Sequence, residues 1–232
     1  MIKIEKTKVM NLEGAIRGMR NPLESWGKSD SYEGPSDIEG AQDYILGEND
    51  LKLATTLANA GSDHGKFLRQ IFVSMDITAP LFWWKEFDTY KVGTVANSTS
   101  TMHTISKKPI TMESFSFDFF FGMDELQDRM CELITIVSIC EELRKKYLEA
   151  LDADNKTRAE QYWRMLIEIL PNGWLQTRTI TLNYAVLRNM YHARKNHKLK
   201  EWHMFCEWIE TLPYAEQLII GRKENTNEST HN

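Results

Sequence analysis

An alternation of apolar and other side chains between positions 71 and 78 constrains the fold of this chain more than any other feature. Apolar residues recur there at every second position, as Ile71, Val73, Met75 and Ile77. Successive side chains of a strand point to opposite faces of the sheet, so this period predicts a strand with one buried face. Pro80 suits a first helical turn, and we expect the next helix, Leu81–Lys91, to deliver Tyr90 and Lys91 at its C-terminal end.

Helical patterns occupy much of the remaining chain. Apolar residues spaced by three and four predict helices at Leu51–Ala60, Asp124–Leu151, Lys156–Leu170, Asn183–Arg194 and Lys200–Thr211. Asp50 is expected to cap the first of these helices, and Gly61 to mark its end. The strand and the helices together indicate a mixed fold of sheet and helices.

Other segments are poorer in such patterns. Ile2 and Ile4 open a short alternating strand. The region from Gly14 to Gly47 is rich in Gly, Ser, Asp and Pro, and we expect a long, partly ordered loop there. Ser, Thr and Asn dominate from Thr94 to Lys108, which predicts a second loop that could hold a ligand. The polar tail, 223–232, is expected to be disordered.

Length and charge narrow the class of protein. The 232 residues suffice for one domain, expected over 1–222, that buries its own core. The net charge of -5 gives no electrostatic reason to expect general nucleic-acid binding. The N-terminal M-I-K-I-E-K-T-K-V lacks the apolar core of a signal peptide, and no stretch approaches the roughly 20 apolar residues of a spanning helix. We therefore expect a soluble, cytoplasmic protein without a membrane partner.

Residue types that often carry chemistry are scattered along the chain. Cys131, Cys140 and Cys206 lie in apolar helical patterns without a C-x-x-C pair, so we expect reduced, buried thiols. The histidines form no metal-ligand pattern, and no metal site is predicted. The pair Trp83-Trp84 and the run Phe115–Phe121 are expected in the core or in a subunit interface rather than in a flavin-stacking site.

The stretch at 88–101, D-T-Y-K-V-G-T-V-A-N-S-T-S-T, is dense in side chains that form hydrogen bonds and follows a Trp-rich segment. In place and length it resembles the signature of the flavin-dependent thymidylate synthases, R-H-R-x-x-S-x-x-x-x-S-x-R. Aligned without gaps, the residues of that signature fall on Thr89, Tyr90, Lys91, Thr94, Thr99 and Thr101. Of the family's R-H-R, only Lys91 keeps a cation, and a tyrosine stands in place of the histidine.

A second run of residues, 170–194, strengthens this resemblance. The family carries near its C-terminal end a motif that resembles L-P-x-x-x-Y-T-R-x-x-W-T-x-N-x-x-x-L-x-N-F-x-x-L-R. The positions that match it are Leu170, Pro171, Thr177, Arg178, Thr181, Asn183, Leu187, Asn189 and Arg194, with one extra residue before Arg178. So many matches in order indicate more than chance.

The resemblance implies a fold and an activity. The fold would be α+β, with a central, mostly antiparallel sheet packed by helices and a long helical elaboration. The activity would be reductive methylation of deoxyuridine monophosphate (dUMP) to thymidine monophosphate. Reduced FAD, recharged by NADPH, would supply hydride, and methylene-tetrahydrofolate would supply the carbon. The active site would be assembled in a homotetramer.

The resemblance also implies roles for single residues. Arg194 would bind and polarise the uracil ring and would be the catalytic residue. The residues that it places at the flavin are Tyr90, Lys91, Thr94, Asn183 and Asn189. Those that it places at the nucleotide are Glu86, Thr99, Ser100, Thr101, Arg178 and Arg194. A guanidinium suits either arginine role, because its planar fork of donors is always charged and can stabilise negative charge as it develops.

Two alternatives stay open. This chain has uncharged residues at most of the positions where the first motif has cations. Each charged contact that is missing for this reason is typically worth about 1.5–3 kcal/mol. The chain could therefore be a related flavoprotein that acts on another pyrimidine nucleotide. It could also be a non-catalytic nucleotide-binding or interaction protein that kept the fold.

Overall fold

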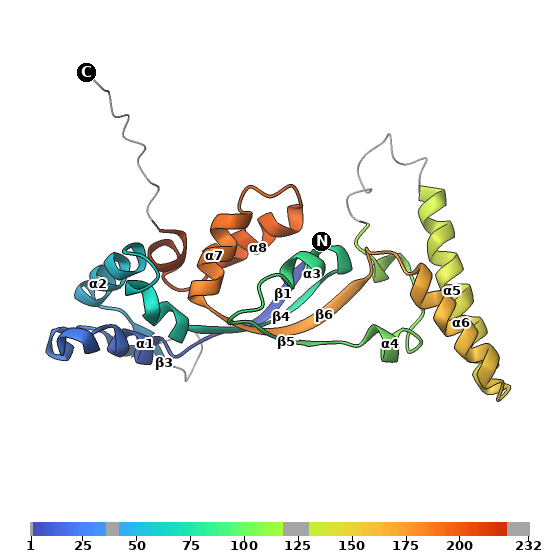
Figure 1. Ribbon diagram of the computed structural model, residues 1–232, viewed down its shortest axis with the longest axis horizontal. Coiled ribbons are helices and arrows are strands. Elements are labelled where there is room, and N and C mark those ends of the chain that lie inside the picture. The colour runs from blue at the N-terminus through green and yellow to red at the C-terminus, as the bar shows by residue number, and fades with distance from the viewer. Residues whose placement is uncertain (1, 36–41, 118–129, 222–232) are drawn as a thin grey trace, which may run out of the picture. The chain divides into compact units, whose positions relative to one another are not determined.

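The structure is a computed structural model that describes residues 2–35, 42–117 and 130–221 of the chain (Figure 1). In chain order its α-helices and strands are β1 (Lys3–Met10), α1 (Leu12–Met19), β2 (Tyr32–Pro35), β3 (Gln42–Ile45), α2 (Glu48–Asn59), β4 (Phe72–Pro80), α3 (Leu81–Phe87), β5 (Val95–Ser98), α4 (Thr101–Thr104), α5 (Met130–Asp152), α6 (Lys156–Ile169), β6 (Leu175–Asn183), α7 (Tyr184–Arg194) and α8 (Lys200–Glu210). The remaining turns of helix are η1 (Asn21–Leu23), η2 (Trp26–Lys28), η3 (His64–Gln70), η4 (Met112–Ser114) and the π-helix η7 (Glu216–Ile220). The predicted disordered tail lies outside the described residues.

A central antiparallel sheet confirms the predicted α+β class. Its strands are ordered β1-β4-β6-β5, and a separate hairpin pairs β2 with β3. The chain forms two compact units. Unit 1 comprises Met1–Glu5, Asp76–Thr89 and Ala96–Ile180, and unit 2 comprises Lys6–Met75, Tyr90–Val95 and Thr181–Asn232.

Strand β4 confirms the predicted alternation. One of its faces is buried along Val73, Met75, Ile77 and Ala79, whereas Phe72 is 40% exposed. Polar side chains pair it with β6: Thr179 donates to the carboxylate of Asp76 at 2.6 Å. The hydroxyls of Thr78 and Thr177 lie 2.7 Å apart.

Helix α3 follows β4 directly but is shorter than predicted. Pro80 is its N-cap rather than part of its first turn. Trp83, Trp84 and Phe87 are buried and pack with ring centroids 4.9–5.3 Å apart, so the two tryptophans belong to the core as predicted. The helix ends at Phe87 because the backbone N–H and the hydroxyl of Thr89 both donate to the carbonyl of Glu86. Tyr90 and Lys91 consequently lie in the loop after the helix, not on it.

The expected long loop from Gly14 to Gly47 is largely wrong. Helix α1, the turns η1 and η2, and the hairpin of β2 and β3 occupy most of its described part. The segment folds because it satisfies one buried carboxylate, that of Asp50. The Asp50 Oδ1 atom accepts from Arg20 Nε at 2.6 Å, and its Oδ2 atom accepts from the hydroxyls of Ser29 and Ser31 at 2.6 Å each.

This contact also corrects the predicted helix cap. Helix α2 begins at Glu48 with Gly47 at the N-cap, so Asp50 lies within the first turn. The carboxylate of Asp30 takes the capping role, because it accepts from the backbone N–H groups of Asn49 and Asp50 at 2.8 and 3.0 Å. Burial raises the pKa of Asp50, but the hydrogen bonds from Ser29, Ser31 and Arg20 outweigh it and leave the pKa below its ordinary value.

The predicted loop from Thr94 to Lys108 contains strand β5 and helix α4. Thr99 explains the difference, because its backbone N–H donates to the carbonyl of Thr177 at 2.9 Å. The amide of Gln176 donates back to the carbonyl of Thr99 at 2.8 Å. Pairing with β6 therefore outweighs the preference of Ser, Thr and Asn for irregular structure.

Helices α5 and α6 form the predicted helical elaboration (Figure 1). The predicted start of the first helix, 124–129, lies outside the described residues. A polar turn separates the two helices as expected, and Asn155 caps α6 by accepting from the backbone N–H of Arg158. Arg144 joins α5 to the segment before it, since it pairs with Glu141 and donates to the carbonyl of Ser106. In the described part of the aromatic run, Phe115 and Phe117 are buried.

Helices α7 and α8 lie close to their predicted ranges. Tyr184, Leu187 and Met190 of α7 are fully buried. From α8, Trp202 and Phe205 are fully buried as well. The guanidinium of Arg188 donates to Asn59 and to carbonyls of η7, which ties the C-terminal turn of unit 2 to α2 and α7.

The cysteine prediction holds for two residues of three. Cys140 and Cys206 are buried, whereas Cys131 is exposed. Cys131 and Cys140 are separated by about two and a half helical turns and so lie on opposite faces of α5. Burial raises the pKa of the Cys140 thiol and raises that of Cys206 to about 11.

Replacing Asp50 with Asn is expected to lower the free energy of unfolding by about 3–5 kcal/mol, because the charge of Arg20 would stay buried without a counter-ion. Urea unfolding at pH 7 measures this loss of stability. The pKa of Asp50 is lowered in the folded chain, so its stabilising effect is full above its ordinary value of 3.8 and is lost as the pH falls through the lowered pKa. The exposed Asp43→Asn is the control, with an expected change under about 0.5 kcal/mol. Equal losses in both variants would contradict this role.

Iodoacetamide at pH 8 is expected to label Cys131 in the folded protein and to leave Cys140 and Cys206 unmodified until urea is added. The raised pKa of each buried thiol keeps it protonated, and burial blocks access. Mass spectrometry of the tryptic peptides gives the rate at each site. Fast labelling of Cys206 without denaturant would show that the packing of α8 does not bury this thiol.

Candidate functional site

The loop 90–95 is held close to the start of α7 in unit 2. Gly93 has a φ of 77°, a conformation that side-chain-bearing residues rarely adopt. A Cβ atom at this position would lie 3.0 Å from Asn183 Nδ2 and 3.0 Å from Val186 Cγ2. Glycine therefore lets the loop backbone approach the first turn of the helix.

Thr94 in this loop has a buried hydroxyl oxygen without a hydrogen-bond partner among the described residues. Leaving a buried polar group unsatisfied costs about 1–3 kcal/mol. Such groups are rare in folded proteins, and a bound molecule or water can satisfy them. The hydroxyl is thus the clearest local sign of a ligand position in unit 2.

Asn183 is the N-cap of α7, directly before the helix, whereas the sequence pattern predicts it as the first helical residue. Its Oδ1 atom accepts from the backbone N–H of Val186 at 3.0 Å, and the residue is buried. The amide oxygen is therefore engaged in the cap, and the Nδ2 group faces the Gly93 side of the loop. A ligand would use the Nδ2 donors.

Asn189 lies on the exposed side of α7 and lines a cavity of about 550 Å³ within unit 2. Arg69, Arg188 and His192 line the same cavity. Burial lowers the pKa of His192, and the charges of Arg188 and Lys195 lower it further, so this histidine is neutral at pH 7. Arg69 and Arg188 give the cavity fixed positive charge.

Arg194 is the last residue of α7 and is held by two aromatic rings. Its Nε atom donates to the hydroxyl of Tyr90 at 2.9 Å. Its Cζ atom lies 4.8 Å from the ring centroid of Trp202 and 5.5 Å from that of Tyr90. The structure therefore brings together Tyr90 from the first motif and Arg194 from the second. Trp202 lies outside both motifs, and sequence reasoning did not identify it.

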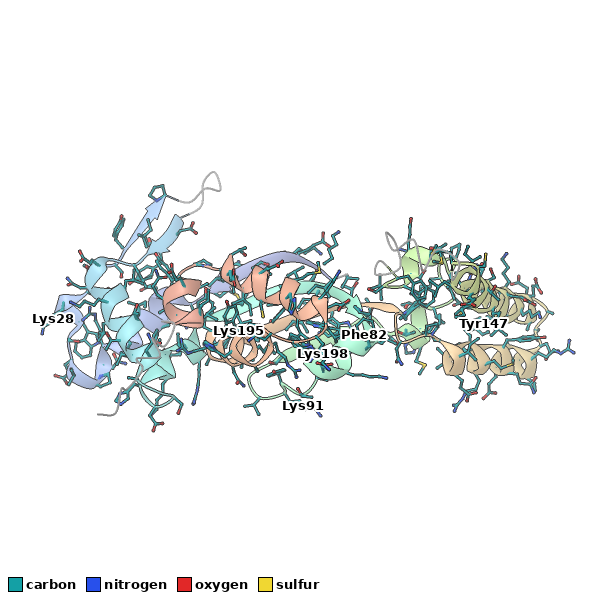
Figure 2. All side chains as sticks on the ribbon, turned by 90° about the horizontal axis from the view of Figure 1, so that it is seen from above. Lys28, Phe82, Lys91, Tyr147, Lys195 and Lys198 are labelled. Carbon is teal, nitrogen blue, oxygen red and sulfur yellow. The ribbon has the colours of Figure 1, made fainter. Side chains whose placement is uncertain are left out.

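Lys91 is exposed in the same loop. Figure 2 marks it, and it marks Lys195 and Lys198 on the segment between α7 and α8. These lysines and Arg194 all belong to unit 2. Of the lysines, the first motif contributes only Lys91.

Unit 1 holds the other predicted substrate residues. Arg178, on β6, donates from Nη1 to the Asp88 carboxylate at 2.6 Å and from Nε to Gln176 Oε1 at 3.0 Å. Its Cζ atom lies 4.2 Å from the ring centroid of Trp84. The matched arginine is thus already paired. Asp88, Gln176 and Trp84 were not predicted as its partners.

The hydroxyl residues of the first motif are only partly available to a ligand. Thr99 donates its hydroxyl to the carbonyl of Thr177 at 3.1 Å. The hydroxyl of Ser100 lies 2.7 Å from His103 Nδ1. Thr101 is the first residue of α4, and Glu86 is half-buried on α3. The structure connects Thr99 to Arg178 through Gln176, and no such contact is described for Thr101.

Comparison with solved structures defines the fold. Thymidylate Synthase X (ThyX) from Helicobacter pylori, in two crystal structures with FAD and dUMP, gives a TM-score of 0.66 at 16% sequence identity, over 94% of this chain and 97% of the other. The chain has the fold of the flavin-dependent thymidylate synthases. The UMP/dUMP methylase PolB from Streptomyces cacaoi, bound with 5-Br UMP, gives 0.56 at 14% identity, over 91% of this chain and 88% of the other. No protein-family model and no curated protein matches the sequence.

The thymidylate synthase fold confirms the resemblance inferred from the two motifs at the level of architecture. Within 2–35, 42–117 and 130–221, no helix combines the length and apolar character that crossing a bilayer requires. Over the same ranges, no three His, Cys, Asp or Glu side chains are grouped so that they could hold a metal ion.

Two variants of Asn183 separate its structural role from ligand binding. Asn183→Ala is expected to lower the free energy of unfolding by about 0.5–2 kcal/mol, since the cap of α7 is lost. Asn183→Asp keeps a capping oxygen but removes the Nδ2 donor, so its stability should stay near that of the wild type. Urea unfolding of both variants measures this. Equal destabilisation by the two changes would show that the cap is not the stabilising contact.

Proposed function

We propose that this chain is a flavin-dependent thymidylate synthase, a methyltransferase that converts dUMP to thymidine monophosphate. Methylene-tetrahydrofolate would supply the carbon and NADPH would reduce the cofactor, FAD. The observation that carries the proposal is the placement of Arg194 at the end of α7, against Tyr90 and Trp202. The fold adds support, because ThyX was crystallised with FAD and dUMP, and PolB is a UMP/dUMP methylase.

The residues of unit 2 fit FAD in their chemistry. The unpartnered hydroxyl of Thr94 and the Nδ2 group of Asn183 can serve a polar ring edge. Asn189 and Arg69 line a cavity whose arginines could pair with a pyrophosphate. Tyr90 and Lys91 complete the predicted set. When bound, FAD would supply the hydride chemistry of the reaction.

Arg194 would bind a carbonyl of the pyrimidine and stabilise negative charge as it develops on the ring. The hydrogen bond to Tyr90 and the stacking on Trp202 fix the plane of its guanidinium before any substrate arrives. Such preorganisation lowers the barrier because the group need not be ordered during the reaction. A tyrosine stands where the family has a histidine, and its hydroxyl accepts a hydrogen bond from Arg194.

We also propose nucleotide contacts for residues of unit 1. Arg178 would contact it with a charged group, and Thr99, Ser100 and Thr101 would offer hydroxyls. Glu86 would accept hydrogen bonds from it. A related activity, methylation of another pyrimidine nucleotide, is favoured by one observation: PolB is named for both UMP and dUMP and has this fold.

We also propose that the protein is cytoplasmic and forms a homotetramer. Helix α5 offers surface for such an interface, because Ile136 and Ile139, which lie three residues apart on one side of the helix, are 40% and 45% exposed. Exposed apolar patches often mark contacts between proteins.

The visible absorption spectrum of the purified protein tests the cofactor. The protein should retain flavin bands after incubation with FAD and desalting, and NADPH oxidation should respond to dUMP with methylene-tetrahydrofolate. Thymidine monophosphate as product would support the first activity, and a different methylated nucleotide the related one. A colourless protein that cannot retain FAD would contradict both and favour a non-catalytic role.

Arg194→Ala should lower kcat by about 10²–10³-fold, because the charge that stabilises the transition state is removed. Arg194→Lys keeps a charge without the planar fork and should recover only part of the activity. Arg164→Ala on α6 is the matched control, since it removes an exposed arginine that pairs with Glu168. Wild-type kcat in Arg194→Ala would remove Arg194 from the catalytic role.

A further inference from the structure

The predicted substrate residues of unit 1 carry an unusual charge balance for a nucleotide site. Arg178 is a cation among them, and its Nη1 atom is 2.6 Å from the carboxylate of Asp88. Lys85 donates to the side-chain oxygen of Asn172 at 2.9 Å. A phosphate that approaches Arg178 therefore meets a cation whose charge is already neutralised.

The other contacts of Arg178 do not depend on Asp88. Trp84 is 1% exposed and donates from Nε1 to the carbonyl of Gln176 at 3.0 Å, so the ring under the guanidinium is fixed. Gln176 accepts from Arg178 Nε, and its own amide is tied to the carbonyl of Thr99. Stacking and this hydrogen bond hold the guanidinium in place. Asp88 is the exchangeable partner, because its side chain is 50% exposed and that of Arg178 is 12% exposed.

We propose that Asp88 is an internal anion that competes with the substrate's phosphate for Arg178 and so sets how strongly the phosphate contributes to recognition. The inference rests on the proposed function, in which Arg178 contacts a pyrimidine nucleotide. Asp88 must leave the guanidinium before the phosphate can pair with it. The chain then distinguishes a nucleoside monophosphate from its nucleoside less than it would with a neutral residue at position 88.

The test compares Asp88→Asn with the wild type. Isothermal titration with dUMP and with deoxyuridine gives both affinities. We expect Asp88→Asn to bind dUMP about tenfold more tightly, because one like charge near the phosphate is removed, and to bind deoxyuridine unchanged. The double variant Asp88→Asn, Arg178→Gln should lose the gain. Glu142→Gln is the matched control: it also removes one negative charge, from an exposed ion pair on α5 with Lys146, and should change neither affinity.

Inorganic phosphate separates this inference from the proposed function. Its stabilisation of the folded protein, measured as a rise in Tm, should be greater for Asp88→Asn than for the wild type and absent in the double variant. This pattern without any binding of dUMP would support the role of Asp88 while the proposed function fails. No gain for dUMP or phosphate in Asp88→Asn, or an equal gain for deoxyuridine, would overturn the inference.

Discussion

A guanidinium cannot be buried without partners, and this requirement shapes each part of the structure. Arg20 and Asp50, which are 4% and 0% exposed, organise the N-terminal region of unit 2. Arg144 and Glu141 join α5 to the segment before it. The rings of Tyr90 and Trp202 lie against the guanidinium of Arg194. The fold thus depends on what each arginine contacts as much as on its apolar core.

The same requirement bears on the two arginines that match the second motif. Tyr90 holds Arg194 through a hydrogen bond without adding or cancelling charge. Asp88, in contrast, cancels the charge of Arg178. The two arginines of the second motif therefore differ in the contacts described for them. The guanidinium of Arg194 lies against aromatic rings, and that of Arg178 is paired with a carboxylate.

Periodicity identified the elements whose stability comes from burying one face. Strand β4 and helices α6, α7 and α8 lie close to their predicted ranges for this reason. The region from Gly14 to Gly47 was mispredicted because polar contacts with Asp50 order it. These contacts join residues far apart in the chain, so no local sequence pattern predicts them. Helix α3 ended early because the side chain of Thr89 competes for a backbone carbonyl, which propensity alone does not foresee.

The sequence predicted only part of the candidate site. The order and spacing of the second motif were enough to identify Arg178 and Arg194. Their partners Trp84, Asp88 and Trp202 lie far from them in the chain, and only the folded structure brings them into contact. A capping signal could have been found, since an asparagine directly before an apolar helical pattern is a typical N-cap. Asn183 occupies that place.

Arg188 has a consequence for how the protein is made. It bonds Asn59 and the carbonyls of Leu218 and Ile219, so the first and last segments of unit 2 close on each other. Contacts between such distant segments form late, because a long loop must close first. On the ribosome, α5 and α6 can pair as soon as both have emerged. Unit 2 can close only after η7 has emerged, and its apolar surfaces stay exposed to chaperones until then.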